Sequence, residues 1–192
     1  IGRNSDQDID RIVITAHIDT KIGTPGAIDN GTGVTIVLML AELLKDFSSK
    51  YPIELVIVNG EDYYGAPGQV KYIEQNAGKF GDIRLNINID GAGYIEGFSC
   101  FSAFDLPENI LDTLNKIILD TPEIIEGLPW YQSDHSVFLQ NGCPAIAVSS
   151  QWFIENMESQ EITHTPKDNL DIVNYERVAE CALGIAELIR RL

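Results

Sequence analysis

Residues 11–47 read RIVITAHIDTKIGTPGAIDNGTGVTIVLMLAELLKDF and combine the features that predict the fold. Residues 11–16 form a compact run rich in β-branched side chains, which is typical of a buried strand. After a glycine-rich loop over residues 26–33, apolar side chains recur at helical spacing from Val34 to Leu44, which predicts a helix over residues 31–47. A buried strand followed by a helix of this kind is typical of an α/β fold.

The same order of strand and helix recurs along the rest of the chain. Further strands are predicted at residues 53–58, 84–89 and 145–149, and further helices after Pro67 and over residues 106–119 and 174–192. We therefore expect three α/β/α layers around a mixed, mostly parallel central sheet. With 192 residues the chain has the length of one domain, so residues 1–192 are expected to form a single domain.

The composition argues against several classes of partner. The chain carries 29 acidic and 13 basic side chains, a formal net charge of −16, which argues against binding to nucleic acids and anionic membranes. The longest apolar run, from Ile36 to Ala41, is far shorter than the ~20 residues that cross a bilayer, so no transmembrane segment is expected. Cys100, Cys143 and Cys181 are widely spaced and odd in number, which indicates buried thiols rather than a disulfide framework.

Side chains that can bind metals or move protons follow three of the predicted strands. His17 comes directly after the first strand, and Asp90 comes directly after the third. Glu61 and Asp62 come shortly after the second strand. Because the carboxyl ends of parallel strands meet at one edge of a sheet, where ligands bind in such folds, we expect these side chains to lie close together.

Two loops add one candidate ligand each. Asp29 lies in the glycine-rich segment before the first long helix, and His164 lies in the polar turn before the last one. The candidate metal ligands are therefore His17, Asp29, Asp62, Asp90 and His164. Imidazole nitrogens and carboxylate oxygens without thiolates suit catalytic zinc, with manganese or cobalt as alternatives.

Two histidines and three aspartates suffice for two metal ions, if each ion binds one of each and the third aspartate is shared. Two Zn²⁺ ions would balance three carboxylates and one bridging hydroxide, and Glu61 would then be free to accept a proton from the water between the metals. Each residue alone also has a structural explanation. Asp29 could cap a helix, and His17 could be a hydrogen-bonded core residue.

Six motifs, taken in order, resemble one family of enzymes. They are AHIDT at residues 16–20, GAIDNGTG at 26–33, NGED at 59–62, NIDGAG at 88–93, SDHSVF at 133–138 and THTP at 163–166. In this order they resemble the zinc-dependent aminopeptidases of peptidase clan MH, in the twenty-eighth family of metallopeptidases. That family also includes glutamate carboxypeptidases and is related to glutaminyl cyclases. The resemblance runs from about Arg11 to Leu192 and implies the phosphorylase/hydrolase-like architecture of zinc exopeptidases.

The resemblance implies a binding site for two divalent metal ions, with zinc as the expected metal. It places His17 and Asp62 on one ion and Asp90 and His164 on the other, with Asp29 bridging them. The family usually has two adjacent glutamates where this chain has Glu61 and Asp62, so one ligand here is a methylene shorter.

The resemblance also assigns residues around the metals. Glu61 matches the catalytic general base, and Asp19 matches a catalytic-site residue expected to orient the ring of His17. Asp134 and His135 match a motif near the site, and we expect neither to be a metal ligand. For His135 a structural or substrate-pocket role is expected.

The activity that the resemblance implies is that of a metallo-aminopeptidase, which removes N-terminal residues from peptide substrates. Carboxypeptidase action or N-terminal glutamine cyclisation on the same scaffold are alternatives, and a non-catalytic, receptor-like binding module is a further one. The aromatic side chains of Trp130, Tyr131, Trp152 and Phe153 are expected either to line a specificity pocket or to pack in the interior.

Two expectations concern what surrounds the domain. Only sixteen residues precede His17, fewer than is usual in the family, so part of an N-terminal edge hairpin or leading helix is expected to be missing. A secreted or extracytoplasmic location is favoured over a cytoplasmic one by the resemblance and by the start at Ile1 rather than at methionine. The sequence leaves the oligomeric state open.

Overall fold

The structure is a computed structural model that describes residues 10–63 and 65–192. Its centre is a six-stranded sheet in the order β2-β1-β3-β6-β4-β5. The strands are β1 (Arg11–His17), β2 (Ile53–Val58), β3 (Ile83–Ile89), β4 (Ser99–Phe104), β5 (Ile124–Glu126) and β6 (Ala145–Ser150). Strands β2, β1, β3 and β6 run parallel, β4 runs antiparallel to β6, and β5 runs parallel to β4.

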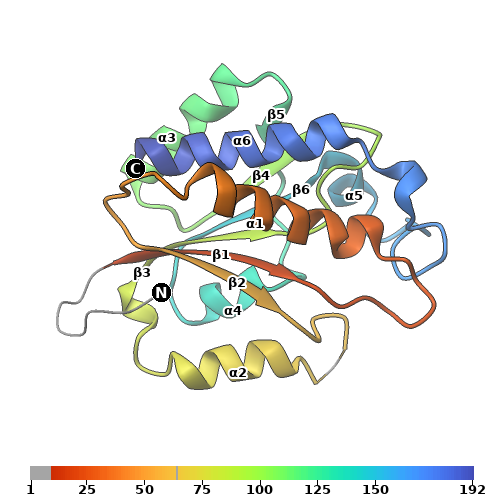
Figure 1. The fold of residues 1–192 in the computed structure, drawn as a ribbon, viewed down its shortest axis with the longest axis horizontal. Coiled ribbons are helices and arrows are strands. Elements are labelled where there is room, and N and C mark those ends of the chain that lie inside the picture. The colour runs from red at the N-terminus through yellow and green to blue at the C-terminus, as the bar shows by residue number, and fades with distance from the viewer. Residues whose placement is uncertain (1–9, 64) are drawn as a thin grey trace.

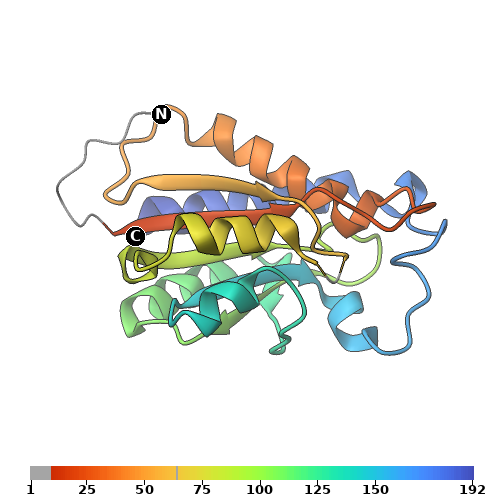
Figure 2. The same ribbon diagram turned by 90° about the horizontal axis from the view of Figure 1, so that it is seen from below.

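Helices cover both faces of this sheet (Figures 1 and 2). Helices α1, α3 and α6 lie on one face, and α2 and α4 lie on the other. The helices are α1 (Thr32–Leu43), α2 (Pro67–Gln75), α3 (Glu108–Asp120), α4 (His135–Gln140), α5 (Gln151–Asn156) and α6 (Tyr175–Arg191). The short turns are η1 (Ala27–Gly31), η2 (Phe80–Asp82) and η3 (Leu170–Ile172). The expected three-layer α/β/α fold with a mostly parallel sheet is therefore confirmed.

Several elements differ from those that the sequence predicts. Strands β4 and β5 and the short helices α4 and α5 were not predicted, because segments of three to six residues are too short to establish a period. Helix α1 ends at Leu43 rather than at residue 47, and α3 begins at Glu108, after Pro107.

The larger core lies between the sheet and helices α1, α3 and α6. Alternate side chains of β1, among them Ile12 and Ile14, point into it and are fully buried. On the α2 and α4 side, Val13 packs with aromatic side chains such as Tyr72 and Phe138. The cysteines are all buried and free, as predicted.

Polar side chains of β1 and β3 occupy the α2 and α4 side of the sheet next to this smaller core. Thr15 donates a hydrogen bond of 2.7 Å to Asn88, and Asn88 donates one of 2.8 Å to Ser133. Asn86 donates to Thr15 at 3.1 Å, so these buried side chains form one hydrogen-bonded row. This polar row leads along both strands toward their carboxyl ends.

Among the helices of the described residues, none has the length and apolar character needed to cross a membrane.

Candidate metal centre

The candidate ligands meet at the carboxyl ends of β1, β2 and β3. His17 is the last residue of β1, Asp90 follows β3 directly, and Asp62 lies in the turn after β2. Asp29 is in η1, immediately before α1, and His164 is in the loop between α5 and η3. Two adjacent parallel strands and three connecting loops therefore build the cluster.

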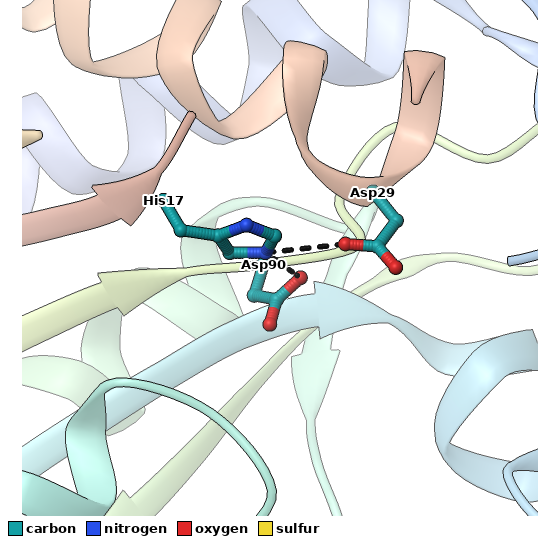
Figure 3. A group of neighbouring side chains, drawn as sticks. All are labelled: His17, Asp29 and Asp90. Atoms are coloured by element: carbon teal, nitrogen blue, oxygen red, sulfur yellow. Dashed lines mark ion pairs between the residues drawn. The ribbon is translucent and has the colours of Figure 1, made fainter. Parts of the chain in front are cut away.

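The imidazole of His17 faces two carboxylates (Figure 3). Its Nε2 atom lies 3.1 Å from Oδ1 of Asp29 and 3.5 Å from Oδ1 of Asp90. His17 and Asp90 end neighbouring strands, so the register of the sheet sets the distance between them.

Asp29 also faces the second histidine. Its other oxygen, Oδ2, lies 3.2 Å from Nε2 of His164, and that nitrogen lies 2.6 Å from Oδ1 of Asp62. One carboxylate thus presents one oxygen to each of two histidine–aspartate pairs. The side chain of His164 is 48% exposed, so the cluster is open to the surface on this side.

These distances group the candidate ligands differently from the grouping that the resemblance implies. The expected pairs were His17 with Asp62 and Asp90 with His164, whereas the structure groups His17 with Asp90 and His164 with Asp62. The reason is topological: β3 is hydrogen-bonded to β1, so Asp90 emerges beside His17, while the turn after β2 carries Asp62 toward the loop of His164.

Asp19 contributes in a different way from the one expected. The Nδ1 atom of His17 lies 3.1 Å from the backbone carbonyl oxygen of Asp19, and its distance to the Asp19 carboxylate is longer, at 3.8 Å. That carboxylate accepts hydrogen bonds from the backbone N–H groups of Gly60, Glu61 and Asp62. The backbone of Asp19 therefore fixes the His17 ring, and its side chain holds the turn that carries Glu61 and Asp62.

A third grouping brings ligand atoms of His17, Asp19 and Asp62 within 4.8 Å of one another. The Asp19 carboxylate already accepts those three backbone hydrogen bonds. We therefore regard this group as part of the support around the cluster rather than as a separate site.

Glu61 lies beside the cluster without belonging to any of these ligand groups. Burial raises the pKa of its carboxyl group to about 8, with a further contribution from the negative charge of Asp90. Such a pKa suits a group that accepts and returns a proton near neutral pH.

The donor atoms fit a pair of divalent cations. Asp62 Oδ2 is buried and has no hydrogen-bond partner among the described residues, and His17 Nε2 is buried facing carboxylate oxygens of Asp29 and Asp90, as expected of atoms placed for a metal. Burial opposes protonation of His17, but the facing carboxylates of Asp90 and Asp29 outweigh it and raise the pKa of the ring to about 12. The same negative potential attracts metal cations, and the nitrogen and oxygen donors suit zinc.

Asp134 and His135 lie at the start of α4. Asp134 is buried and accepts a hydrogen bond of 2.6 Å from Gln69, and burial raises the pKa of its carboxyl group to about 6. His135 is fully buried, and its Nε2 lies 2.8 Å from the backbone oxygen of Trp130. Its ring packs between Phe104 and Trp130, at centroid distances of 5.1 and 4.9 Å, which is a structural position.

The four aromatic residues near the later motifs have different environments. Trp130 and Phe153 are buried and pack in the interior. Tyr131 is 63% exposed, and Trp152 is partly buried against Tyr94, with ring centroids 5.0 Å apart. Only Tyr131 and Trp152 of the four therefore remain candidates for contact with a substrate.

Sequence reasoning missed Asp168, which lies four residues after His164. Its carboxylate accepts hydrogen bonds from the backbone N–H groups of Ile28 and Asp29, at 2.7 and 3.1 Å. The turn that carries it was noted only for His164, because nothing in the sequence indicates that its one acidic residue contacts a loop about 140 positions earlier.

Comparison with known proteins gives a family from the sequence and a shared fold from the structure. Residues 1–189 match Peptidase family M28. Aminopeptidase YwaD of Bacillus subtilis (strain 168) is 24% identical over 182 residues, which cover 89% of this chain and 38% of that protein.

Two solved structures show the same fold at low sequence identity. BSAP, a zinc aminopeptidase from Bacillus subtilis, superposes with a TM-score of 0.79 and 21% identity, covering 97% of this chain and 47% of that one. Macrostomum lignano glutaminyl cyclase gives a TM-score of 0.74 and 16% identity, covering 96% and 68%. This chain spans less than half the length of YwaD and of BSAP. Because the family match covers almost the entire sequence, the chain belongs to Peptidase family M28.

Proposed function

We propose that this chain forms the catalytic domain of an aminopeptidase that uses two divalent metal ions, with zinc as the metal. The observation that carries the proposal is the position of Asp29, whose two oxygens lie 3.1 and 3.2 Å from the imidazoles of His17 and His164. His17, Asp90 and Asp29 would hold one ion, and His164, Asp62 and Asp29 would hold the other.

The chemistry divides between the metals and Glu61. Bound zinc would supply a Lewis acid that polarises the scissile carbonyl group and makes water more acidic. Glu61 accepts the proton of the attacking water and donates it to the leaving amine, a role supported by its position beside the cluster but outside the ligand groups. The Asp19 carboxylate holds Glu61 in place through the backbone of its turn.

The charges around the centre support a substrate with a free amino group. The chain carries a formal net charge of −16, and the Asp19 carboxylate lies beside the three aspartate ligands. A positively charged N-terminal ammonium group is therefore favoured near the centre over a C-terminal carboxylate. The relative named an aminopeptidase and the zinc aminopeptidase of similar fold support the same choice.

Glutaminyl cyclisation is the second candidate, because a glutaminyl cyclase shares the fold over 96% of this chain. A panel of peptides with a free N-terminus, an acetylated N-terminus or an N-terminal glutamine separates the candidates. We expect release of the first residue from free peptides only, with two zinc ions bound per chain. Formation of pyroglutamate without cleavage, with one ion per chain, would instead support the cyclase.

Substitution of Glu61 tests the assignment of the base. Glu61→Gln should retain both zinc ions and lower kcat by at least about a hundredfold, because proton transfer is lost while the ligands remain. Zinc content and steady-state kinetics measure the two effects. Turnover close to that of the unmodified enzyme would remove Glu61 from the mechanism.

A further inference from the structure

Asp168 contacts the loop that carries Asp29 through both its side chain and its backbone. It is fully buried. Its Oδ1 accepts a hydrogen bond of 2.7 Å from Ile28 N–H, and its Oδ2 accepts one of 3.1 Å from Asp29 N–H. Its backbone oxygen accepts a third bond, of 3.4 Å, from Ala27 N–H. One residue therefore accepts hydrogen bonds from three consecutive backbone N–H groups of η1.

The same residue belongs to the turn of His164. The N–H group of Asp168 donates to the carbonyl oxygen of Thr165 at 3.1 Å, and the hydroxyl of Thr165 donates to the carbonyl oxygen of Ile162 at 2.8 Å. These bonds make the turn compact on both sides of His164. A fixed Asp168 therefore fixes the loop of His164 relative to the loop of Asp29.

Asp29 needs support from outside its own turn. Its backbone angles, φ −116° and ψ 84°, are not helical, so helical hydrogen bonds do not hold it in place. On its other side, the amide of Asn30 donates a bond of 2.8 Å to the carbonyl oxygen of Ile89, the residue before Asp90. Asp29 is thus held between two anchors: Asn30 joins η1 to the end of β3, and Asp168 joins it to the loop of His164.

We propose that Asp168 is a positioning residue that aims the shared carboxylate of Asp29 at the second metal site, formed with His164 and Asp62. This inference rests on the proposed function. A carboxylate suits the role because both of its oxygens accept hydrogen bonds, as the two N–H groups of Ile28 and Asp29 require. An asparagine offers only one acceptor oxygen, and its NH₂ group would face an N–H donor.

The test compares Asp168→Asn with Asp171→Asn in titrations with Co²⁺. Asp171 is exposed and lies three residues further along, so its substitution removes a carboxylate from the same segment and leaves the hydrogen bonds of Asp168 to η1 in place. The unmodified protein and Asp171→Asn should bind two ions with the same visible absorption spectrum. Asp168→Asn should bind one of the two ions at least about tenfold more weakly and change the absorption bands of bound cobalt.

The outcomes separate this inference from the proposed function. If Asp168→Asn binds both ions like Asp171→Asn, with an unchanged spectrum, the inference fails while the dimetal site stands. If the unmodified protein binds no Co²⁺, both fail. A reduced thermal stability of Asp168→Asn with normal affinity and spectrum would show a role in folding only, and would also overturn the inference.

Hydrogen exchange of the unmodified protein provides a test that does not depend on the variant folding. The amides of Ile28 and Asp29 should exchange slowly, and loading with Co²⁺ should slow them further, because the metal and Asp168 hold the same loop. Rapid exchange of these two amides in the loaded protein would rule out the anchor.

Discussion

Asp29 and Asp62 are both candidate ligands, but they occupy different positions in the cluster. Asp29 lies between the two histidines, whereas Asp62 approaches only His164 closely among the ion pairs of the cluster. Loss of a ligand shared by two ions, as proposed for Asp29, weakens both metal sites. Loss of a ligand to one ion, as proposed for Asp62, weakens one site.

We expect Asp29→Ala to retain little or no zinc after dialysis and Asp62→Ala to retain about one ion per chain, held by His17, Asp90 and Asp29. Elemental analysis of the dialysed proteins measures the difference, with circular dichroism as the control for folding. Equal zinc contents in the two variants would contradict the shared position of Asp29.

His135 makes the stability of the fold sensitive to pH. Burial holds the pKa of this ring below its ordinary value of 6.5, so it stays neutral in the native protein while the unfolded chain takes up a proton. The unfolded state therefore binds more protons as the pH falls through about 6.5, and the native state loses stability relative to it.

His135→Gln removes this titration and keeps a neutral polar side chain. The unmodified protein should be more stable than the variant at pH 7.5, and its advantage should shrink toward pH 5.5, by at most about 1.4 kcal/mol per pH unit. Urea unfolding of both proteins in the presence of a chelator measures the difference. A difference in unfolding free energy that does not change with pH would contradict the prediction.

At the scale of elements, the start of α1 is pressed against the end of β3. A Cβ atom on Gly33 would collide with the side-chain oxygen of Asn30 and would lie 2.7 Å from the carbonyl oxygen of Ile89. The absence of a side chain at Gly33 lets Asn30 bond to both elements, donating to Ile89 and accepting from Gly33 N–H. This close contact sets the position of η1 and hence of Asp29.

Gly33→Ala should therefore lower the free energy of unfolding by about 1–3 kcal/mol, as overpacking does in a tightly packed interior. The matched control is Gly81→Ala, because a Cβ atom on Gly81 has no neighbouring atom within 4 Å and should change stability little. Chemical denaturation compares the two. Equal free energies of unfolding for Gly33→Ala and Gly81→Ala would mean that α1 can move away from β3 without loss of stability.

At the scale of the whole molecule, the centre joins parts of the chain that are far apart in sequence. Its candidate ligands come from β1, η1, the turn after β2, the end of β3 and the loop before η3. A metal ion held by these segments binds the native state and not the unfolded chain, so binding should stabilise the entire fold.

Removal of metal by a chelator should therefore lower Tm, and zinc added back should restore it in a concentration-dependent manner. At free zinc one hundred times the Kd, one site contributes about 2.7 kcal/mol, which corresponds to a shift of about 5–10 °C for a chain of this size. Differential scanning calorimetry of the chelated and reloaded protein measures the shift. Magnesium at the same concentration is the control, since it prefers oxygen ligands in octahedral geometry.

The sequence by itself determined the fold class. Long β-branched and helical runs, such as residues 11–16 and 31–47, carry a strong local period, and this alternation requires a sheet between two helical layers. It also selected candidate ligands that lie together in the structure, because strand ends are readable in the sequence and parallel strands end at a common edge.

Only the tertiary structure decided how these residues are used. Which aspartate lies beside which histidine depends on the strand order β2-β1-β3, and no local pattern encodes that order. The role of the Asp19 carboxylate as a support for the turn of Glu61, and the contact of Asp168 with η1, likewise depend on loops that meet only after the chain has folded. Side-chain periodicity is a local property of the chain, whereas the distances between ligands follow from packing between distant segments.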